Sequence, residues 1–284
     1  MSIKGLIDCH THTQFSVDSE ADINLMIERA IELGLSAYAI TDHCECNRWY
    51  SEEHYKGEDT YRYFDFGKDF ENSVSAVTEL KKKYSDKINL ICGIEMGQAL
   101  QDIEIAERII SDKRLDFVIA SMHQLPKTED FAFLDYTKFT QAEIKVLLER
   151  YFTEIHKLCL WGKFDILGHL TYVLRYIEGA YNIKVDMKPY DFIIEEIFKA
   201  VISNGCGIEI NTSGLRQKYG DCFPSYDYVR LYRELGGEIL SLGSDTHFVE
   251  DVGKGISEGA EIAKRAGFDY ITYYKNRKPE FIKI

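Results

Sequence analysis

The chain has 284 residues, of which 45% are hydrophobic and 29% charged, a composition typical of a globular protein. Its 47 acidic residues outnumber 34 basic ones and give a formal net charge of -13, which disfavours binding to nucleic acid or to an anionic membrane surface. No apolar run reaches the roughly 20 residues of a membrane helix, and the N-terminus turns polar too early for a signal peptide.

Short apolar runs alternate with longer segments of helical periodicity along the chain. The runs have the length of strands buried on both faces and lie at residues 5–7, 37–40, 90–94, 117–120, 164–167, 207–210 and 238–242. Between them, apolar residues recur with a spacing near 3.6, which predicts helices over residues 25–33, 70–84, 103–110, 144–160, 192–202 and 228–235. Gly34, Gly205 and Gly236 follow three of these segments, as expected for glycine at a left-handed helix end.

The C-terminal part adds a helix over 257–266 and a run at 270–272, which we expect to form an eighth, edge strand. Two polar and aromatic stretches without a clear period, 45–63 and 124–138, predict long loops. Alternating strands and helices predict parallel βα units, either closed as a barrel or open and doubly wound. Without an internal repeat or a flexible linker, residues 1–284 are expected to form a single domain.

Histidine and carboxylate side chains fall at the carboxyl ends of the predicted strands. Of the eight histidines, only His54, in the first long loop, and His156, within a predicted helix, lie elsewhere. Because α/β barrels build their active sites at the carboxyl ends of the strands, the remaining side chains predict one shared site. The expected metal ligands are His10, His12, Asp18, His43, Glu95, His123, His169, Asp245 and His247.

The chemistry of these side chains is that of a transition-metal site. His10 and His12, like Asp245 and His247, are two residues apart, so an extended chain presents both members of each pair on one side. Imidazole with carboxylate suits Zn, Fe or Mn rather than Ca or Mg. The set exceeds the four or five ligands of one ion, and we expect two or three divalent ions with positions open to water. Asp42 is expected to orient a neighbouring ligand rather than bind metal.

The seven cysteines are odd in number, scattered and never spaced C-x-x-C. This pattern is typical of reduced, mostly buried thiols rather than of a disulfide framework. We therefore expect a cytoplasmic protein.

Six motifs occur in a characteristic order along the chain. From Asp8 to Gly255 they read D-C-H-T-H-T, T-D-H, G-I-E, S-M-H, G-H and S-D-T-H, and they resemble the PHP (polymerase and histidinol phosphatase) superfamily. The segment E-I-N-T-S-G-L-R, the step Pro224-Ser225 and L-G-S-D-T-H resemble its histidinol-phosphate phosphatase branch. The resemblance implies a distorted (β/α)7 TIM-like barrel with a trinuclear metal centre at the C-terminal ends of the strands.

The resemblance also distributes the ligands among three ions. It implies one ion held by His10, His12, Glu95 and Asp245, a second by Asp18, His43 and His247, and a third by Glu95, His123 and His169. Some relatives have a histidine in place of Asp18, and a carboxylate is a harder ligand, so the metal at that position stays open.

The activity implied by the resemblance is hydrolysis of L-histidinol phosphate to L-histidinol and inorganic phosphate, a step of histidine biosynthesis. Metal ions suit this reaction because they acidify a bridging water and neutralise the phosphoryl oxygens. We expect the metal-held hydroxide to attack phosphorus directly, without a phosphoenzyme. Asp245, His247 and His43 are expected to manage the protons, with Asp245 as the partner of the attacking water.

A phosphate also needs side chains that fix its orientation, and guanidinium groups bind it in a bidentate way. Arg175, six residues after His169, and Arg216, five after Asn211, are expected to form this clamp, with Ser213 as a further hydrogen-bond donor. The ammonium and imidazole of histidinol would require a carboxylate and an aromatic wall. Candidates for these are Glu45, Tyr172, Tyr176 and Tyr219.

Two other functions remain open from the sequence. The same metal centre could act on another small phosphate ester, a phosphodiester or a nucleotide, or on a DNA end, although no basic stripe with interleaved aromatics supports nucleic-acid binding. A non-catalytic metal-binding protein is the second alternative. The oligomeric state is not predicted.

Overall fold

A parallel sheet that curls into a nearly closed barrel forms the centre of the molecule. The computed structural model describes residues 2–50 and 64–284, so His54 and most of the loop expected over 45–63 lie outside the described residues. Along this described chain the barrel strands are paired in the order β1 (Ile7–Asp8), β2 (Ala37–Ile40), β4 (Asn89–Gly97), β5 (Phe117–Ser121), β6 (Ile166–Leu167), β7 (Gly207–Asn211) and β8 (Leu240–Gly243).

Hydrogen bonds between the first and last strands close the barrel. The Cys9 backbone N–H donates to Leu242 O at 2.8 Å, and just beyond the strands the His12 N–H donates to Thr246 O, also at 2.8 Å. Every residue of β2, β5, β7 and β8 is buried, as the continuous apolar runs predict for parallel strands covered on both faces. The closed alternative, the distorted (β/α)7 barrel, is confirmed over the open doubly wound sheet.

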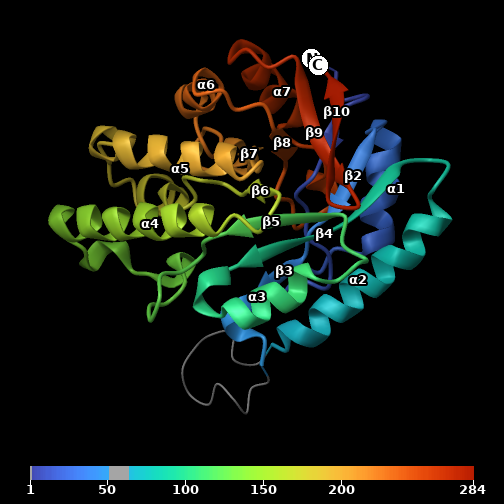
Figure 1. Ribbon diagram of the computed structural model, residues 1–284, viewed down its shortest axis with the longest axis horizontal. Coiled ribbons are helices and arrows are strands. Elements are labelled where there is room, and N and C mark those ends of the chain that lie inside the picture. Colours follow the sequence, from blue (N-terminus) through green and yellow to red (C-terminus); the bar gives the residue numbers. More distant parts are fainter. Residues whose placement is uncertain (1, 51–63) are drawn as a thin grey trace.

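Amphipathic helices surround the strands in chain order, as Figure 1 shows from α1 and α2 on the right to α7 at the top. Within the described residues they are α1 (Ile23–Leu33), α2 (Phe66–Lys83), α3 (Ile103–Ile110), α4 (Gln141–Trp161), α5 (Asp191–Ser203), α6 (Tyr226–Glu234) and α7 (Ile256–Arg265). Local sequence signals fix their ends. Thr140 forms a capping box with Glu143 at the start of α4, and Gly34 ends α1 with φ 73°. His156 is a half-buried residue of α4, as expected.

The C-terminal segment differs from the expectation. The run at 270–272 belongs to β9 (Tyr270–Lys275), which pairs antiparallel with β10 (Lys278–Lys283) in a separate two-stranded sheet, so it is not an eighth strand of the barrel. The two residues between them both have positive φ, the geometry of a tight hairpin turn. At the hairpin tip, Arg277 Nε donates to Asp165 Oδ2 at 2.6 Å, directly before β6. The hairpin therefore packs at the amino-terminal end of the barrel, opposite the predicted site.

A short strand, β3 (His43–Glu45), was also not predicted. It pairs parallel with β4, with His43 beside Glu95 and Glu45 beside Gly97. The first long loop therefore begins after Glu45 rather than at it. In the described part of the chain, none of the helices combines the length and the apolar character that crossing a bilayer requires.

Candidate metal centre

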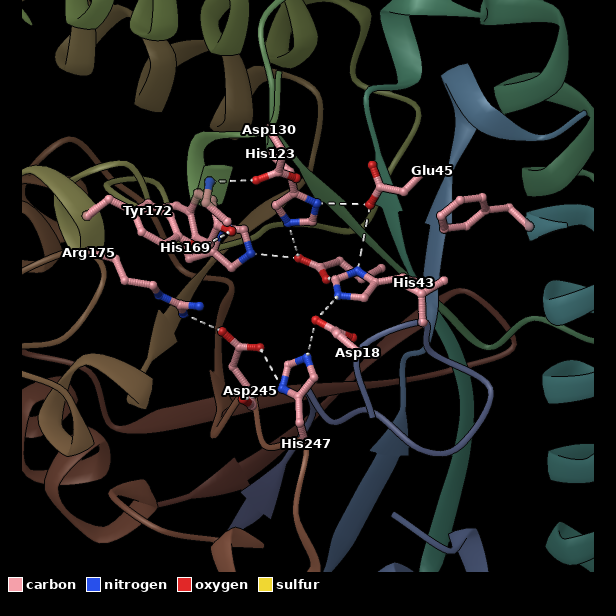
Figure 2. A pocket seen from close by; sticks show the side chains of 15 residues that line it. Asp18, His43, Glu45, His123, Asp130, His169, Tyr172, Arg175, Asp245 and His247 are labelled. Atoms are coloured by element: carbon pink, nitrogen blue, oxygen red, sulfur yellow. Dashed lines mark hydrogen bonds and ion pairs between the residues drawn. The ribbon is translucent and has the colours of Figure 1, made fainter. Parts of the chain in front are cut away.

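A hollow lies at the carboxyl ends of the strands, and all the expected ligands except His10 and His12 line it (Figure 2). Glu95, in β4, lies at its centre. Its Oε1 is 2.6 Å from His169 Nε2 and 3.1 Å from His123 Nε2. Its Oε2 is 2.9 Å from His43 Nδ1 and 3.4 Å from His10 Nε2. One carboxylate thus faces four imidazoles that arrive from four different strand ends.

A second group forms where the barrel closes. His10 and His12 project to the same side, as their spacing predicts, with ring centroids 5.1 Å apart. Asp245 Oδ1 lies 3.8 Å from His10 Nε2 and 3.4 Å from His12 Nε2. Glu95 Oε2 is 3.6 Å from His12 Nε2, so the four side chains expected to share one ion face one another. Asp245 has φ 52°, a left-handed conformation that is unusual for a non-glycine residue and is typical of functional sites.

Asp18 completes a third group at the rim of the hollow. Its Oδ2 lies 3.1 Å from His247 Nε2 and 3.5 Å from His43 Nε2. The His247 ring also stacks on His12 with centroids 4.2 Å apart. Asp18 therefore projects onto the two histidines with which it was grouped, rather than serving only in the polar entry to α1.

The donor set tests whether metal ions fit here. Five buried ring nitrogens make no hydrogen bond among the described residues: His10 Nε2, His12 Nε2, His43 Nδ1, His169 Nδ1 and His247 Nε2. Of these, His43 Nδ1 and His247 Nε2 lie within ion-pair distance of Glu95 and Asp18, at 2.9 Å and 3.1 Å. In four groups of three residues the candidate ligand atoms lie within 4.8 Å of one another: His12, His43 and His247; His10, Glu95 and His169; His10, His12 and Asp245; His43, Glu95 and His123. Buried imidazole nitrogens that make no hydrogen bond and are arranged around carboxylates fit divalent transition-metal ions. The assignment of each ligand to a particular ion stays a prediction.

Electrostatics favour the ionised forms of two carboxylates at the centre of the site, Glu95 and Asp245. Burial alone would raise the pKa of Glu95, but the neighbouring charged forms of His123, His10 and His43 hold that pKa well below its usual value. Burial likewise opposes ionisation of Asp245, but Arg175 together with His10, His12 and His247 outweighs it, so the pKa of Asp245 is also lowered well below its usual value. The site therefore keeps its central carboxylates ionised.

His12 shifts in the opposite direction. Burial, followed by the neighbouring His247 and His43, lowers the pKa of His12 well below its usual value. Its imidazole is therefore neutral, and a neutral ring nitrogen is the form that binds metal.

A carboxylate that the sequence reasoning missed supports two ligands at once. Glu209 Oε1 lies 2.7 Å from His10 Nδ1, and Glu209 Oε2 accepts the His169 backbone N–H at 2.9 Å. Gly243 makes room for it, because a Cβ there would overlap the Glu209 carboxylate. The available signal was an acid inside the buried run of β7, two residues before Asn211 and hence on the same face.

Glu45 supports His123 in a similar way. Its Oε1 is 2.9 Å from His123 Nδ1, while Gln98 Nε2 donates to Glu45 Oε2 and Gln98 Oε1 accepts the His123 N–H at 2.8 Å. Gly97 is needed beside them, since a Cβ would overlap the Glu45 carboxylate. Glu45, considered above for substrate recognition, is thus engaged with a candidate ligand.

Asp42 contacts the site indirectly, through residues that hold His12. It accepts hydrogen bonds from the Thr13 N–H at 2.6 Å, from Ser16 Oγ at 3.0 Å and from Ser73 Oγ at 2.6 Å. Ser16 Oγ in turn lies 3.0 Å from His12 Nδ1. Asp42 therefore holds the serine that orients His12, which is the kind of role expected from its position.

The two expected arginines approach Asp245 from different sides. Arg175 lines the hollow, and its Nη2 donates to Asp245 Oδ2 and to Ser213 Oγ, each at 2.6 Å. Arg216 lies behind, where its Nε is 3.3 Å from Asp251 Oδ2 and its Nη2 donates to Asp245 O at 3.4 Å. Arg175 Nε and Arg216 Nη1 are buried and lack hydrogen-bond partners within the described chain, so each arginine keeps a free donor.

Two of the candidate tyrosines lie at the hollow. The Tyr172 ring is 4.8 Å from the His169 ring, and its hydroxyl is 2.7 Å from that of Tyr176. Tyr219 instead stacks on Phe223 and lines a different cavity beside α5 and α6. The loop over 124–138 contributes Asp130 to the hollow, a residue that the sequence reasoning did not single out.

Comparisons with known proteins identify a family and several relatives of this chain. A family model described as the PHP domain matches residues 8–213. The histidinol-phosphatase of Lactococcus lactis subsp. lactis (strain IL1403) is 28% identical over 278 residues, which cover 96% of this chain and 95% of that protein. A probable histidinol-phosphatase of Thermotoga maritima is 28% identical over 271 residues, covering 94% of each. The crystal structure of the Lactococcus lactis histidinol phosphate phosphatase, complexed with zinc, L-histidinol and phosphate, superposes with a TM-score of 0.80 at 26% identity and covers 97% of this chain and 98% of that one.

Proposed function

Because this chain belongs to the PHP domain family, we propose that it is a metal-dependent phosphomonoesterase that hydrolyses L-histidinol phosphate to L-histidinol and inorganic phosphate. The observation that supports this most directly is the convergence of buried imidazoles and carboxylates around a single hollow that the Arg175 guanidinium also lines. A relative that matches nearly the whole chain holds zinc, L-histidinol and phosphate. The substrate is therefore a small phosphate monoester rather than nucleic acid.

We assign the ligands to two or three divalent ions of Zn, Fe or Mn. The three sets are His10, His12, Glu95 and Asp245; Asp18, His43 and His247; and Glu95, His123 and His169. Bound ions supply an acidified water and neutralise the phosphoryl oxygens. Glu209, Glu45 and Ser16 hold the imidazoles in the orientation that keeps the inward nitrogen available.

The remaining chemistry belongs to side chains of this chain. Arg175 and Arg216 bind the phosphoryl oxygens through their free N–H groups and fix the phosphorus in line for attack. Asp245, held by Arg175 at one oxygen, accepts the proton of the attacking water at the other. His43 and His247 lie at the rim and assist proton transfer to the departing alkoxide. Attack is direct, so phosphate leaves without a phosphoenzyme.

All seven cysteines are free and buried. Buried free thiols suit a reducing compartment, and we place the enzyme in the cytoplasm.

The test is phosphate release from L-histidinol phosphate by protein purified with its native metals, with metal content measured in the same sample. We expect turnover that a chelator abolishes, and little activity on bis(4-nitrophenyl) phosphate or single-stranded DNA. Bound metal without turnover of any ester would favour a metal-binding protein instead. A phosphoenzyme trapped from labelled substrate would exclude direct attack.

A further inference from the structure

The carboxylates that line the hollow differ in whether they already have a cationic partner. Four of the five are engaged with histidine or arginine side chains, namely Asp18, Glu45, Glu95 and Asp245. The fifth, Asp130, lies at the end of the loop that follows β5 and caps the short 3-10 helix Phe131–Phe133. Asp130 has no such partner among the described residues, and the proposed reaction gives it no role.

Asp130 is a buried carboxylate with a single hydrogen-bond donor. The residue is only 6% exposed, and its Oδ1 accepts the Ala132 N–H at 2.8 Å. Among the described residues no lysine, arginine or histidine forms an ion pair with it. Burial raises the pKa of Asp130 to about 6. A desolvated carboxylate that forms no ion pair is unfavourable in the free protein, even with the charges of His123 and Arg48 nearby, and a positively charged ligand group would offset the cost of its burial.

The position of Asp130 suits the far end of a substrate whose phosphate binds at the arginines. Figure 2 shows Asp130 beside His123 on one side of the hollow. Asp245 lies on the opposite side, where Arg175 donates a hydrogen bond to it. Tyr172 lies between these two sides, with its ring centroid 4.8 Å from that of His169. A substrate with phosphate at one end and a cation at the other would span the hollow.

We propose that the carboxylate of Asp130 binds the ammonium group of the substrate and thereby selects amino-alcohol phosphates. This inference rests on the proposed function and deepens it. L-Histidinol phosphate has two groups that can be cationic. Its ammonium is charged throughout the neutral range, whereas an imidazole with a pKa near 6.5 is mostly neutral at pH 7.5, so the ammonium is the better partner for a fixed carboxylate.

The experiment compares two substrates in two proteins. L-Histidinol phosphate is assayed beside its des-amino analogue, 3-(imidazol-4-yl)propyl phosphate, with wild type and with the Asp130→Asn variant. Asparagine keeps an oxygen for the Ala132 N–H but removes the charge. The ratio of kcat/KM for L-histidinol phosphate over the analogue should fall at least about tenfold in the variant, the effect of losing one charged hydrogen bond.

Glu129→Gln is the matched control, since Glu129 is the exposed neighbour on the same loop and does not line the hollow. An unchanged ratio in Asp130→Asn, or an equal fall for both substrates, overturns the inference while the proposed function stands. The wild type alone provides a second measurement that does not depend on the variant folding. It should prefer L-histidinol phosphate to the analogue by at least about tenfold, and equal use of both also overturns the inference. Failure of wild type to hydrolyse L-histidinol phosphate instead contradicts the proposed function.

Discussion

His10 and Glu209 are 199 residues apart in the sequence, yet His10 Nδ1 lies 2.7 Å from Glu209 Oε1 and both side chains are fully buried. The same carboxylate accepts the backbone N–H of His169. A single acid of β7 thus sets the orientation of one candidate ligand from the first strand and the backbone position of another from the sixth. Because each of these histidines faces Glu95 with its Nε2, the geometry of the centre depends on a residue that does not face the hollow.

Replacing Glu209 by Gln should lower metal affinity while leaving all the candidate metal ligands in place. Glutamine keeps the size of the side chain but loses the charge that orients and polarises His10, and loss of such a partner typically lowers metal affinity about 10–100-fold. Metal retained per chain after dialysis against a graded series of chelator concentrations measures this. Glu238→Gln, an exposed acid distant from the site, serves as the control. Retention curves that coincide with wild type would show that Glu209 has only a packing role.

Gln98 should prove to be a positioning residue. Its side chain bridges Glu45 and the backbone of His123, and its own φ of 53° is left-handed. Glycine at this position relieves the backbone while removing the amide, so Gln98→Gly isolates the loss of the side chain. We expect kcat/KM to fall about tenfold together with loss of bound metal, because His123 is then less fixed. Gln98→Asn, which tolerates the same backbone and keeps an amide, should recover part of both; a Gly variant with full metal content and activity contradicts the prediction.

The arginines offer a test of the phosphate clamp. Arg175→Ala and Arg216→Ala should each lower kcat/KM by at least about tenfold through loss of a charged hydrogen bond. Lysine should restore activity only in part, since it lacks the planar fork of guanidinium. Steady-state assays against Arg230→Ala, an exposed residue of α6, provide the comparison. The prediction for Arg216 is the less secure of the two, because Arg216 pairs with Asp251 and does not line the hollow. Wild-type kinetics in Arg216→Ala would remove this residue from the site.

The predictable part of the site is the part that follows from local chain geometry. His10 and His12 could be grouped because alternate residues of an extended chain share a side, and Glu95 and His169 because the carboxyl ends of parallel strands meet. The barrel and its helices followed from the same periodicities. That residues 1–284 form one domain stays a prediction.

The missed features depend on contacts between distant segments. Glu209 and Glu45 could not be assigned to their histidines because that requires the pairing of strands, and Asp130 because it requires the path of a loop with no periodicity. The hairpin of β9 and β10 was missed because its tight turn has no glycine at the two left-handed positions, Asn276 and Arg277, to mark it.

The unpaired charge of Asp130 predicts a pH-dependent gain in stability for Asp130→Asn. In the folded protein burial raises the pKa of Asp130 from 3.8 to about 6, so folding favours the protonated form. Asp130 therefore does not lower the free energy of unfolding of the wild type below pH 4. Its ionisation lowers that free energy as the pH rises from about 4 to 6, and the free energy stays reduced above that range. Asparagine has no charge to desolvate, so the variant should gain about 1–2 kcal/mol in free energy of unfolding at pH 7.5 and almost nothing at pH 4.

Urea denaturation of the metal-free proteins at pH 4, 5.5 and 7.5 measures this difference without interference from bound ions. Glu129→Gln, with an exposed carboxyl, should show no such growth of stability with pH. A gain of equal size at all three pH values would point to improved packing instead of relief of a buried charge. A variant less stable than wild type at pH 7.5 would mean that the carboxylate is already paired in the free protein. We therefore expect Asp130→Asn to be more stable than wild type but to discriminate less between the two substrates. Such a trade-off between stability and function is typical of a binding group that is buried before its ligand arrives.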